Sequence, residues 1–334
     1  MLLKPSKKSE IHKILLISLT NIGDVILTFP VIDILKKEFP SAKLSIVIGP
    51  KAESLLRGNP FLDKIHIFDQ RQPFLKSLSW IRELRKERFD LVIDLRNTAI
   101  PFMVSPKYRT PYFTKKFQEL HMWEKHLRRL KSVYAFERKT AERCALFVSA
   151  EDEAYVDQII EKQIGDKKKY IVVAPGAADH SKKWPEKKFA DVCERLIRDY
   201  HVKIVLVGNR EDHESARQVC EREKSEAINL CGQTNLAQLA HLLRHCFFAI
   251  VNDSAPMHLA SYLNIPVLAL FGPTNPLHYG PWSTKSCFVR KNESCRACAA
   301  PKASLVHSCM DAIQVEDVLN KLRINVQESH VHFE

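Results

Sequence analysis

Short runs of consecutive apolar residues alternate along the chain with longer segments in which apolar residues recur every three or four positions. The runs are typical of strands buried on both faces of a parallel sheet, and the periodic segments predict amphipathic helices. The predicted strands are 13–18, 43–49, 64–68, 89–95, 170–176, 203–208, 247–253 and 266–272. The predicted helices are 31–39, 76–87, 186–200, 213–224, 235–246 and 254–263.

This alternation predicts an α/β protein built from right-handed βαβ units, with doubly wound parallel sheets. The charged stretch EKQIGDKKK at 161–169 separates two such series and is the best candidate for a linker. We therefore expect two Rossmann-like domains, residues 1–164 and 165–334. The pattern leaves open whether the last helix packs back on the first domain.

The composition changes this picture little. Of 334 residues, 45% are hydrophobic and 27% are charged, as in soluble proteins. No apolar run reaches the ~20 residues that span a bilayer, and ILLISL at 14–19 is shorter than a signal peptide's core of roughly 7–15 residues. The nine cysteines are an odd number in a large chain, which argues against a disulfide framework. We expect a cytoplasmic protein.

The positive charge is concentrated in one part of the chain. The net charge is +12, and residues 71–143 hold 18 Lys or Arg against 8 Asp or Glu, a net +10. A solvated basic surface accounts for this, and so does an acidic partner such as nucleic acid, anionic lipid or a phosphorylated sugar. Zinc-finger spacing, ribonucleoprotein motifs and heptads are absent from the sequence, so we expect no nucleic-acid partner.

Neither GxGxxG nor GxxxxGK[ST] occurs in the sequence, which argues against a dehydrogenase or a P-loop enzyme. Phosphate can still be held at helix N-termini, at the carboxyl ends of parallel strands. In VVAPGAADHSKKWPEKKF (172–189), Gly176 ends a strand, and Lys183 is either a diphosphate ligand or a solvated loop residue. In VGNREDHESA (207–216), Glu211 is either a ribose ligand or an ordinary first-turn acid.

The densest polar signal is AIVNDSAPMHLASYLNIPVLALFGPTNP at 249–276. We expect Asp253 or Ser254 to cap the following helix, with His258 on the same helical face as Ser254. Thr274 lies in the turn after the next strand. These residues form either an anion pocket or an ordinary N-cap with a core histidine.

A similar turn in the first half reads SLTNIGDVILTFP at 18–30. It contains Asn21, Gly23 and Asp24, and the carboxylate is either a helix N-terminal acid or a functional group.

A cysteine group follows later in the chain: Cys287, Cys295, Cys298 and Cys309, with His307 nearby. Cys295-x2-Cys298 resembles half a zinc site, but the remaining residues lack the paired spacing of common zinc modules. Reduced structural thiols are the favoured interpretation, and a metal is the alternative.

Taken in order, these motifs resemble glycosyltransferase family 9, the bacterial heptosyltransferases that build the lipopolysaccharide inner core. The likeness extends from KILLISLTNIGDVILTFPVIDILKKEFP to the CM pair at 309–310 and includes APGAADHSKKWP, INLCGQTNLAQLAHLL and NDSAPMHLASYLNIPVLALFGPTNP. The tail ESCRACAAPKASLVHSCMDAI is also similar to the family's. Ser254 stands where some members carry Thr or Gly, and 96–145 matches no motif.

The resemblance implies a GT-B architecture, with an acceptor-binding first domain and a donor-binding second domain facing a cleft. It implies inverting transfer of heptose from ADP-heptose to an anionic lipopolysaccharide core sugar. Asp24 corresponds to the catalytic base, with Asn21 and Gly23 on the acceptor side. Donor contacts fall on Lys183, Asp253, Ser254 and His258, and we add Gly176, Glu211 and Thr274 from their positions at strand ends.

We predict transfer without a metal or other cofactor, because no DxD-type pair ends a strand. The first domain's basic charge predicts peripheral contact with the inner-membrane surface. The alternatives are a GT-B transferase using another nucleotide sugar, a sugar-nucleotide epimerase, and a non-catalytic protein that binds sugar nucleotides or lipids. The sequence does not identify the accepting sugar.

Overall fold

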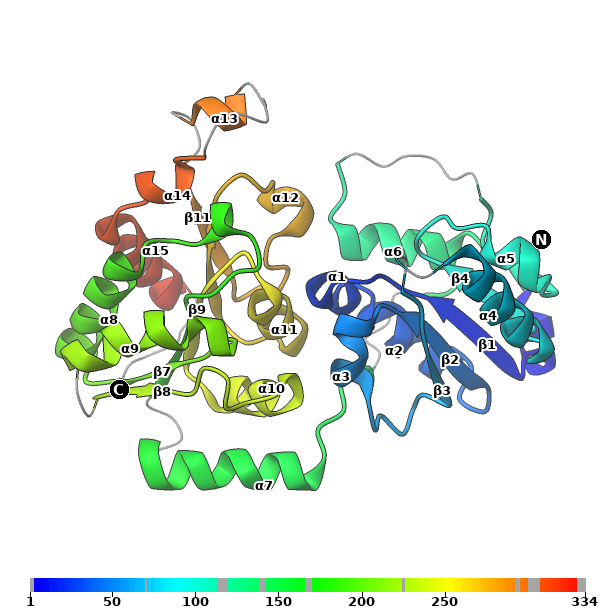
Figure 1. Cartoon of the computed structure of the whole chain (residues 1–334), viewed down its shortest axis with the longest axis horizontal. Helices are drawn as coiled ribbons and strands as arrows, with labels where there is room; N and C mark the ends of the chain where they lie inside the picture. Colours follow the sequence, from blue (N-terminus) through cyan, green and yellow to red (C-terminus); the bar gives the residue numbers. More distant parts are fainter. Residues whose placement is uncertain are drawn as a thin grey trace. The chain divides into compact units, whose positions relative to one another are not determined.

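The computed structural model describes residues 3–69, 71, 73–112, 119–137, 142–165, 170–223, 226–291, 295–299 and 307–328. The chain divides into two compact units, residues 1–147 and 148–334, which run from blue to green and from green to red in Figure 1. Each unit has its own sheet, and every strand pair within it is parallel. The predicted α/β class with two Rossmann-like domains is confirmed.

The first sheet has the strand order β3-β2-β1-β4-β5. Its strands are β1 (Lys13–Ile17), β2 (Lys43–Ile48), β3 (Lys64–Ile67), β4 (Leu91–Asp94) and β5 (Tyr108–Arg109). The helices are η1 (Pro5–Glu10), α1 (Ile22–Ile26), α2 (Phe29–Glu38), η2 (Pro50–Ala52), α3 (Glu53–Leu56), α4 (Phe74–Lys86), α5 (Ile100–Val104) and α6 (Met122–Lys131). One core lies where side chains of β1, β2 and β4 meet Leu84 of α4 and Ile100 and Val104 of α5.

The second sheet has the order β11-β10-β9-β6-β7-β8. Its strands are β6 (Tyr170–Ala174), β7 (Lys203–Leu206), β8 (Ala227–Asn229), β9 (Phe248–Asn252), β10 (Val267–Phe271) and β11 (Cys287–Arg290). The helices are α7 (Ala150–Ile159), η3 (Ile160–Ile164), η4 (His180–Lys182), α8 (Glu186–Tyr200), η5 (Arg210–Asp212), α9 (His213–Glu223), α10 (Leu236–His245), α11 (Ala255–Leu263), α12 (Pro276–Tyr279), α13 (Arg296–Ala299), α14 (Cys309–Ala312) and α15 (Val315–Glu328).

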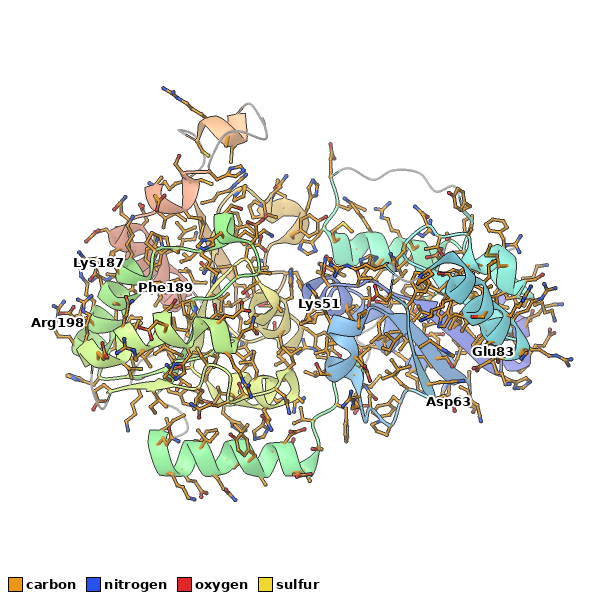
Figure 2. All side chains as sticks on the ribbon, in the orientation of Figure 1. Lys51, Asp63, Glu83, Lys187, Phe189 and Arg198 are labelled. Carbon is orange, nitrogen blue, oxygen red and sulfur yellow. The ribbon has the colours of Figure 1, made fainter. Side chains whose placement is uncertain are left out.

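The central strands of this sheet are buried along their whole length, as their apolar runs predict. Alternate residues of β6, β7, β9 and β10 pack against α8, α9 and α15 in one large core. Helix α8 shows the predicted amphipathicity: Phe189 is buried against the sheet, whereas Lys187 and Arg198 lie on the exposed side (Figure 2).

The unit boundary falls between residues 147 and 148, earlier than the expected boundary at 164/165. The expected linker begins as a π-helical turn, η3, that continues α7, and residues 166–169 lie outside the described residues. Helix α7 belongs to the second unit because it packs on α10, where Asp152 accepts hydrogen bonds from Asn235 (3.0 Å) and Gln238 (2.9 Å).

The last helix, α15, also belongs to the second unit. It contacts α8 and β11, and Val318, Leu319 and Leu322 are buried in the same core as the sheet. Over its described residues, α15 thus packs within the second unit. None of the helices in the described residues combines the length and the apolar composition of a membrane-spanning segment.

Candidate functional site

The predicted donor-side residues lie in loops that follow four neighbouring strands. In the sheet, β10, β9, β6 and β7 lie side by side and parallel, so their carboxyl ends form one edge. Thr274 follows β10, Asp253 and Ser254 follow β9, and Gly176 and Lys183 follow β6. Glu211 follows β7. The fold therefore brings motifs that are up to about one hundred residues apart to a common edge, where ligands of such sheets bind.

Two half-buried lysines lie at this edge, each beside a buried carboxylate. Lys182 Nζ is 2.8 Å from Asp253 Oδ2, and Lys183 Nζ is 3.3 Å from Asp212 Oδ1. The carboxylates are 4% and 8% exposed, whereas the lysines keep about 30% of their surface open to an incoming anion. The sequence motifs predict roles for Lys183 and Asp253 but not for Lys182 and Asp212.

Asp212 is the most constrained of these carboxylates. Its Oδ2 accepts a hydrogen bond from Asn209 N (2.9 Å), the second half of a capping box at η5. A Cβ built on Gly176 would overlap this carboxylate, and one on Gly208 would lie 2.8 Å from it. Gly176 therefore has a steric role in making room for Asp212. The Asn209-x-x-Asp212 spacing is a signal that could have identified this residue.

Glu211, next to Asp212, is exposed at the same edge. Its predicted contact with a ribose stays a prediction.

The N-terminus of α11 differs from the sequence prediction in its capping. Ser254 occupies the N-cap position, but its hydroxyl donates to the carbonyl of Asn252 (3.2 Å) and makes no capping hydrogen bond. The Asp253 carboxylate contacts Lys182 instead. The predicted side-chain cap is therefore wrong, because both side chains have competing local partners, and the N-cap side chain does not close this helix end.

His258 lies on α11 and is 6% exposed. Its ring stacks on Trp282, with 5.7 Å between centroids and 28° between planes. This environment agrees with the interpretation of His258 as a core histidine, which was one of the two alternatives in the sequence analysis.

The loop between β6 and α8 is anchored to its surroundings by buried polar groups. Asn252 donates to Pro175 O (2.6 Å) and accepts from Trp184 N (3.3 Å). Trp184 is 1% exposed, packs edge-on against Phe189, and donates its indole N–H to Ile313 O (3.1 Å). The Lys-Trp-Pro sequence thus fixes Lys183 by burying the residue that follows it.

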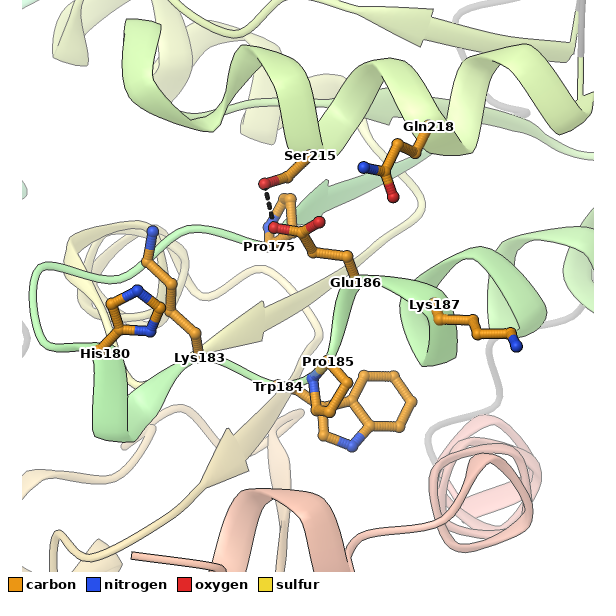
Figure 3. A pocket seen from close by; sticks show the side chains of 9 residues that line it. All are labelled: Pro175, His180, Lys183, Trp184, Pro185, Glu186, Lys187, Ser215 and Gln218. Atoms are coloured by element: carbon orange, nitrogen blue, oxygen red, sulfur yellow. Dashed lines mark hydrogen bonds between the residues drawn. The ribbon is translucent and has the colours of Figure 1, made fainter. Parts of the chain in front are cut away.

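A cavity of about 390 Å³ opens beside Lys183 (Figure 3). The residues that line it come from the β6–α8 loop, the start of α8 and α9: Pro175, His180, Lys183, Trp184, Pro185, Glu186, Lys187, Ser215 and Gln218. Ser215 and Glu186 are hydrogen-bonded across it. Lys183 lines this cavity, whereas Asp253 and Ser254 do not.

In the first domain, Asp24 lies in the first turn of α1, directly after the carboxyl end of β1. It is half-buried, and its Oδ2 accepts a hydrogen bond from Asn21 Nδ2 (3.0 Å). Asn21 is the N-cap residue but makes no side-chain capping bond. The carboxylate therefore keeps acceptor capacity, with Asn21 fixing its orientation.

Two further features position this turn. A Cβ on Gly49, at the end of β2, would lie 2.9 Å from Thr20 Cα, so the β1 loop packs directly on Gly49. Ser18 and Thr28 share a buried hydrogen bond of 2.9 Å that joins the two ends of the turn. Gly49 was missed because its role depends on strand pairing, which a single strand does not show.

The loop after β4 lies next to the Asp24 turn, because β1 and β4 are neighbours. Asp94 is 1% exposed and accepts hydrogen bonds from Arg96 N (2.8 Å) and the Thr98 hydroxyl (3.0 Å). Burial lowers the pKa of the Arg96 guanidinium, and Asp94 opposes that effect. Arg96 is thus a cation on the same sheet edge as Asp24, in the region where sequence analysis found no motif.

Three of the four cysteines of the predicted group come together with His307. Cys295, Cys298, Cys309 and His307 offer ligand atoms that all lie within 4.8 Å of one another. Cys287 is not part of the group; it lies on β11 in the main core. Burial raises the pKa of the Cys295 thiol, but N–H groups of Ser308 and Cys298 and the His307 ring outweigh it and bring the value to about 5.

Comparison with known proteins agrees with this arrangement. A family profile described as glycosyltransferase family 9 (heptosyltransferase) matches residues 77–307. Lipopolysaccharide heptosyltransferase 3 of Escherichia coli K12 is 27% identical over 78% of this chain and 83% of its own length. Lipooligosaccharide heptosyltransferase 2 of Haemophilus influenzae is 27% identical over 92% of this chain and 98% of its own length.

Among solved structures, E. coli ADP-heptose lps heptosyltransferase II superposes with a TM-score of 0.73 at 22% identity. The superposition covers 95% of this chain and 99% of that one. The fold is therefore shared over nearly the whole length of both. The profile match spans well over half of the chain, so this protein is a glycosyl-transferring enzyme and belongs to glycosyltransferase family 9, the heptosyltransferases.

Proposed function

We propose that the enzyme transfers heptose from ADP-heptose to an inner-core sugar of lipopolysaccharide, with inversion at the anomeric carbon. The observation that carries the proposal is the strand edge where Lys182 lies beside Asp253, at the N-terminus of α11, and Lys183 lies beside Asp212, after β7. Two cations and a helix N-terminus suit a diphosphate, which can displace the carboxylates as the lysines' partner. The names of the relatives support heptose as the sugar and the lipopolysaccharide core as the acceptor.

In this proposal the donor binds the second domain, with Asp253, Ser254, His258, Gly176, Glu211 and Thr274 forming or supporting its site. The acceptor binds the first domain near Asn21, Gly23 and Arg96. A core acceptor carries phosphates and carboxylates, which suits the basic charge of 71–143. Residues 113–118 and 138–141 of that stretch lie outside the described residues.

The chemistry follows from these positions. The Asp24 carboxylate takes the proton of an acceptor hydroxyl as the oxygen attacks the anomeric carbon. The bond between that carbon and the diphosphate oxygen breaks, and ADP leaves with the electron pair. Lys183 and the N-terminus of α11 stabilise the growing negative charge. We propose that these groups replace the Mg²⁺ that other transferases use, so added Mg²⁺ should not raise kcat.

The test is a transfer assay with purified enzyme, ADP-heptose and a deacylated core acceptor, in which ADP release and glycosylated product are both measured. We expect ADP and product in equal amounts, and a product with the opposite anomeric configuration to the donor. Turnover with UDP- or GDP-sugars but not ADP-heptose would contradict the proposed donor. ADP release without the acceptor at the same rate would contradict transfer.

We also propose peripheral contact with the cytoplasmic face of the inner membrane. Phe102 and Met103 of α5 and Tyr112 are 48%, 42% and 44% exposed, and the Arg109 guanidinium lies 4.4 Å from the centre of the Phe102 ring. Exposed aromatic residues beside basic ones suit an anionic lipid surface. Binding to anionic vesicles should weaken with salt and in Phe102→Ser, and salt-insensitive binding would contradict this mode.

A further inference from the structure

Cys295, Cys298, His307 and Cys309 offer four ligand atoms that lie close enough together to bind one metal ion. His307 Nδ1 is 3.7 Å from Cys295 Sγ and 3.4 Å from Cys298 Sγ, and Cys298 Sγ is 3.9 Å from Cys309 Sγ. Ligands about 2.3 Å (sulfur) and 2.1 Å (nitrogen) from a tetrahedral Zn²⁺ lie about 3.6–3.8 Å from one another. These three separations lie within about 0.2 Å of those edges. The sulfur–sulfur separation is much longer than a disulfide bond of about 2.05 Å.

The backbone around the group has the features of a metal knuckle. Cys295 and Cys298 are joined by a tight turn in which Cys298 N donates to Cys295 O (3.0 Å). Cys295 and Cys309 are 2% and 1% exposed, so the two deepest sulfurs are shielded from water.

We propose that Cys295, Cys298, Cys309 and His307 bind a structural metal ion in a closed tetrahedral Cys3His site. Zn²⁺ is the ion that we expect. A set of three sulfurs and one imidazole suits Zn²⁺ and, less commonly, Fe²⁺. Because four protein ligands fill the coordination sphere, the ion has no open position for substrate. The inference does not depend on the proposed donor or acceptor.

The site lies where a bound ion would stabilise the strand edge that carries the proposed donor-binding residues. Cys309 begins α14, where the side chain of Met310 packs closely against Gly272 in the loop that carries Thr274. The carbonyls of Asp311 and Ile313 accept hydrogen bonds from Lys188 Nζ (2.6 and 2.7 Å). Ile313 O also accepts the Trp184 indole N–H. Fixing Cys309 to Cys295 therefore fixes the segment on which the Lys183 loop rests.

The test measures the metal content of the full-length protein, purified under reducing conditions, by elemental analysis. We expect about one equivalent of zinc per chain, lost in Cys298→Ser, with a lower Tm and a raised donor KM. The matched control is Cys220→Ser, a half-buried thiol on α9 outside the group, which should keep the metal and the Tm. Replacement by Co²⁺ should give the absorption bands of tetrahedral thiolate coordination.

The experiment remains decisive even if Cys298→Ser folds poorly, because the metal content of the wild-type chain by itself shows whether an ion is bound. Iron in place of zinc, with the same loss in the variant, supports the site and changes only the ion. A metal-free wild-type chain whose Tm does not respond to Zn²⁺ would overturn the proposal. A disulfide between Cys298 and Cys309 would also overturn it. Metal that stays bound in Cys298→Ser would do the same, and Asp157, His241 and His245 would then be the other group that could bind the ion.

Discussion

Asp24 combines an acceptor-only side chain, partial exposure and a fixed orientation, because Asn21 Nδ2 holds one of its oxygens at 3.0 Å. An acid in the first turn of a helix is common for electrostatic reasons alone, so position does not decide its role. The functional alternative rests on the resemblance to the family, in which the proposed catalytic base corresponds to Asp24.

Replacing Asp24 by Asn should lower kcat by about 10²- to 10⁴-fold, because an amide cannot accept the acceptor's proton. Donor KM should stay within a few-fold, since the proposed donor site lies in the other domain. Steady-state kinetics with ADP-heptose test this. Asn21→Ala is the matched control: it keeps the carboxylate and should cost far less. Equal losses in both variants would indicate that Asp24 only supports the turn.

Substitutions of the neighbouring acids Glu211 and Asp212 should distinguish an effect on donor binding from an effect on the stability of the fold. Asp212→Ala removes a buried cap and the partner of Lys183, so we expect a loss of about 1–2 kcal/mol in unfolding free energy and a raised donor KM. Glu211→Ala should leave stability within about 0.5 kcal/mol, because the side chain is exposed. If Glu211 binds the ribose, its donor KM should also rise, by about 2- to 10-fold.

Chemical denaturation and donor titration of both variants provide the measurement. A destabilised Glu211→Ala together with a stable Asp212→Ala would contradict the structure.

At the scale of elements, α6 depends on a neutral histidine. His126 is 2% exposed on α6, and burial, followed by the charges of Arg129, His121 and Lys125, lowers its pKa to about 4. Its unfolded value is about 6.5, so between these values the unfolded chain binds a proton that the folded chain does not. The contribution of His126 to stability is therefore fully present above pH ~6.5 and is lost as the pH falls toward 4.

We expect this group to add a slope of about 1.4 kcal/mol per pH unit to the unfolding free energy across that window. His126→Phe should remove that slope, whereas His12→Gln, at an exposed position, should not. Denaturation midpoints measured from pH 7 to pH 4 provide the comparison. An unchanged slope in His126→Phe would show that other groups dominate acid unfolding.

Strand prediction at this scale succeeded for every central strand and for the edge strand β3, and it failed for the other three edge strands. β5, β8 and β11 have only two to four residues, and each forms one edge of its sheet. Such strands carry too few residues for a periodic signal, and their pairing depends on a neighbour far away in the sequence.

At the scale of the whole molecule, the unit boundary predicts how the chain can be divided. A fragment of residues 148–334 should unfold cooperatively, because it keeps α7 on α10. A fragment of 165–334 should have a lower Tm or aggregate. It loses the buried side chains of Val156, Ile159 and Ile160, each about 1.5–3 kcal/mol, and uncovers the α10 surface. Calorimetry of the two fragments tests this, and equal stability would contradict the assignment of α7.

The sequence by itself determined the fold class, the order of the central elements and the strand-end turns that hold Asp24, Lys183 and Asp253. Each of these follows from local periodicity, because buried parallel strands and amphipathic helices leave distinct patterns. Tertiary structure alone decided the pairing of Lys183 with Asp212, the steric role of Gly176, the packing of α7 and the meeting of His307 with three cysteines. These features depend on distances between segments remote in sequence, which only the packed chain defines.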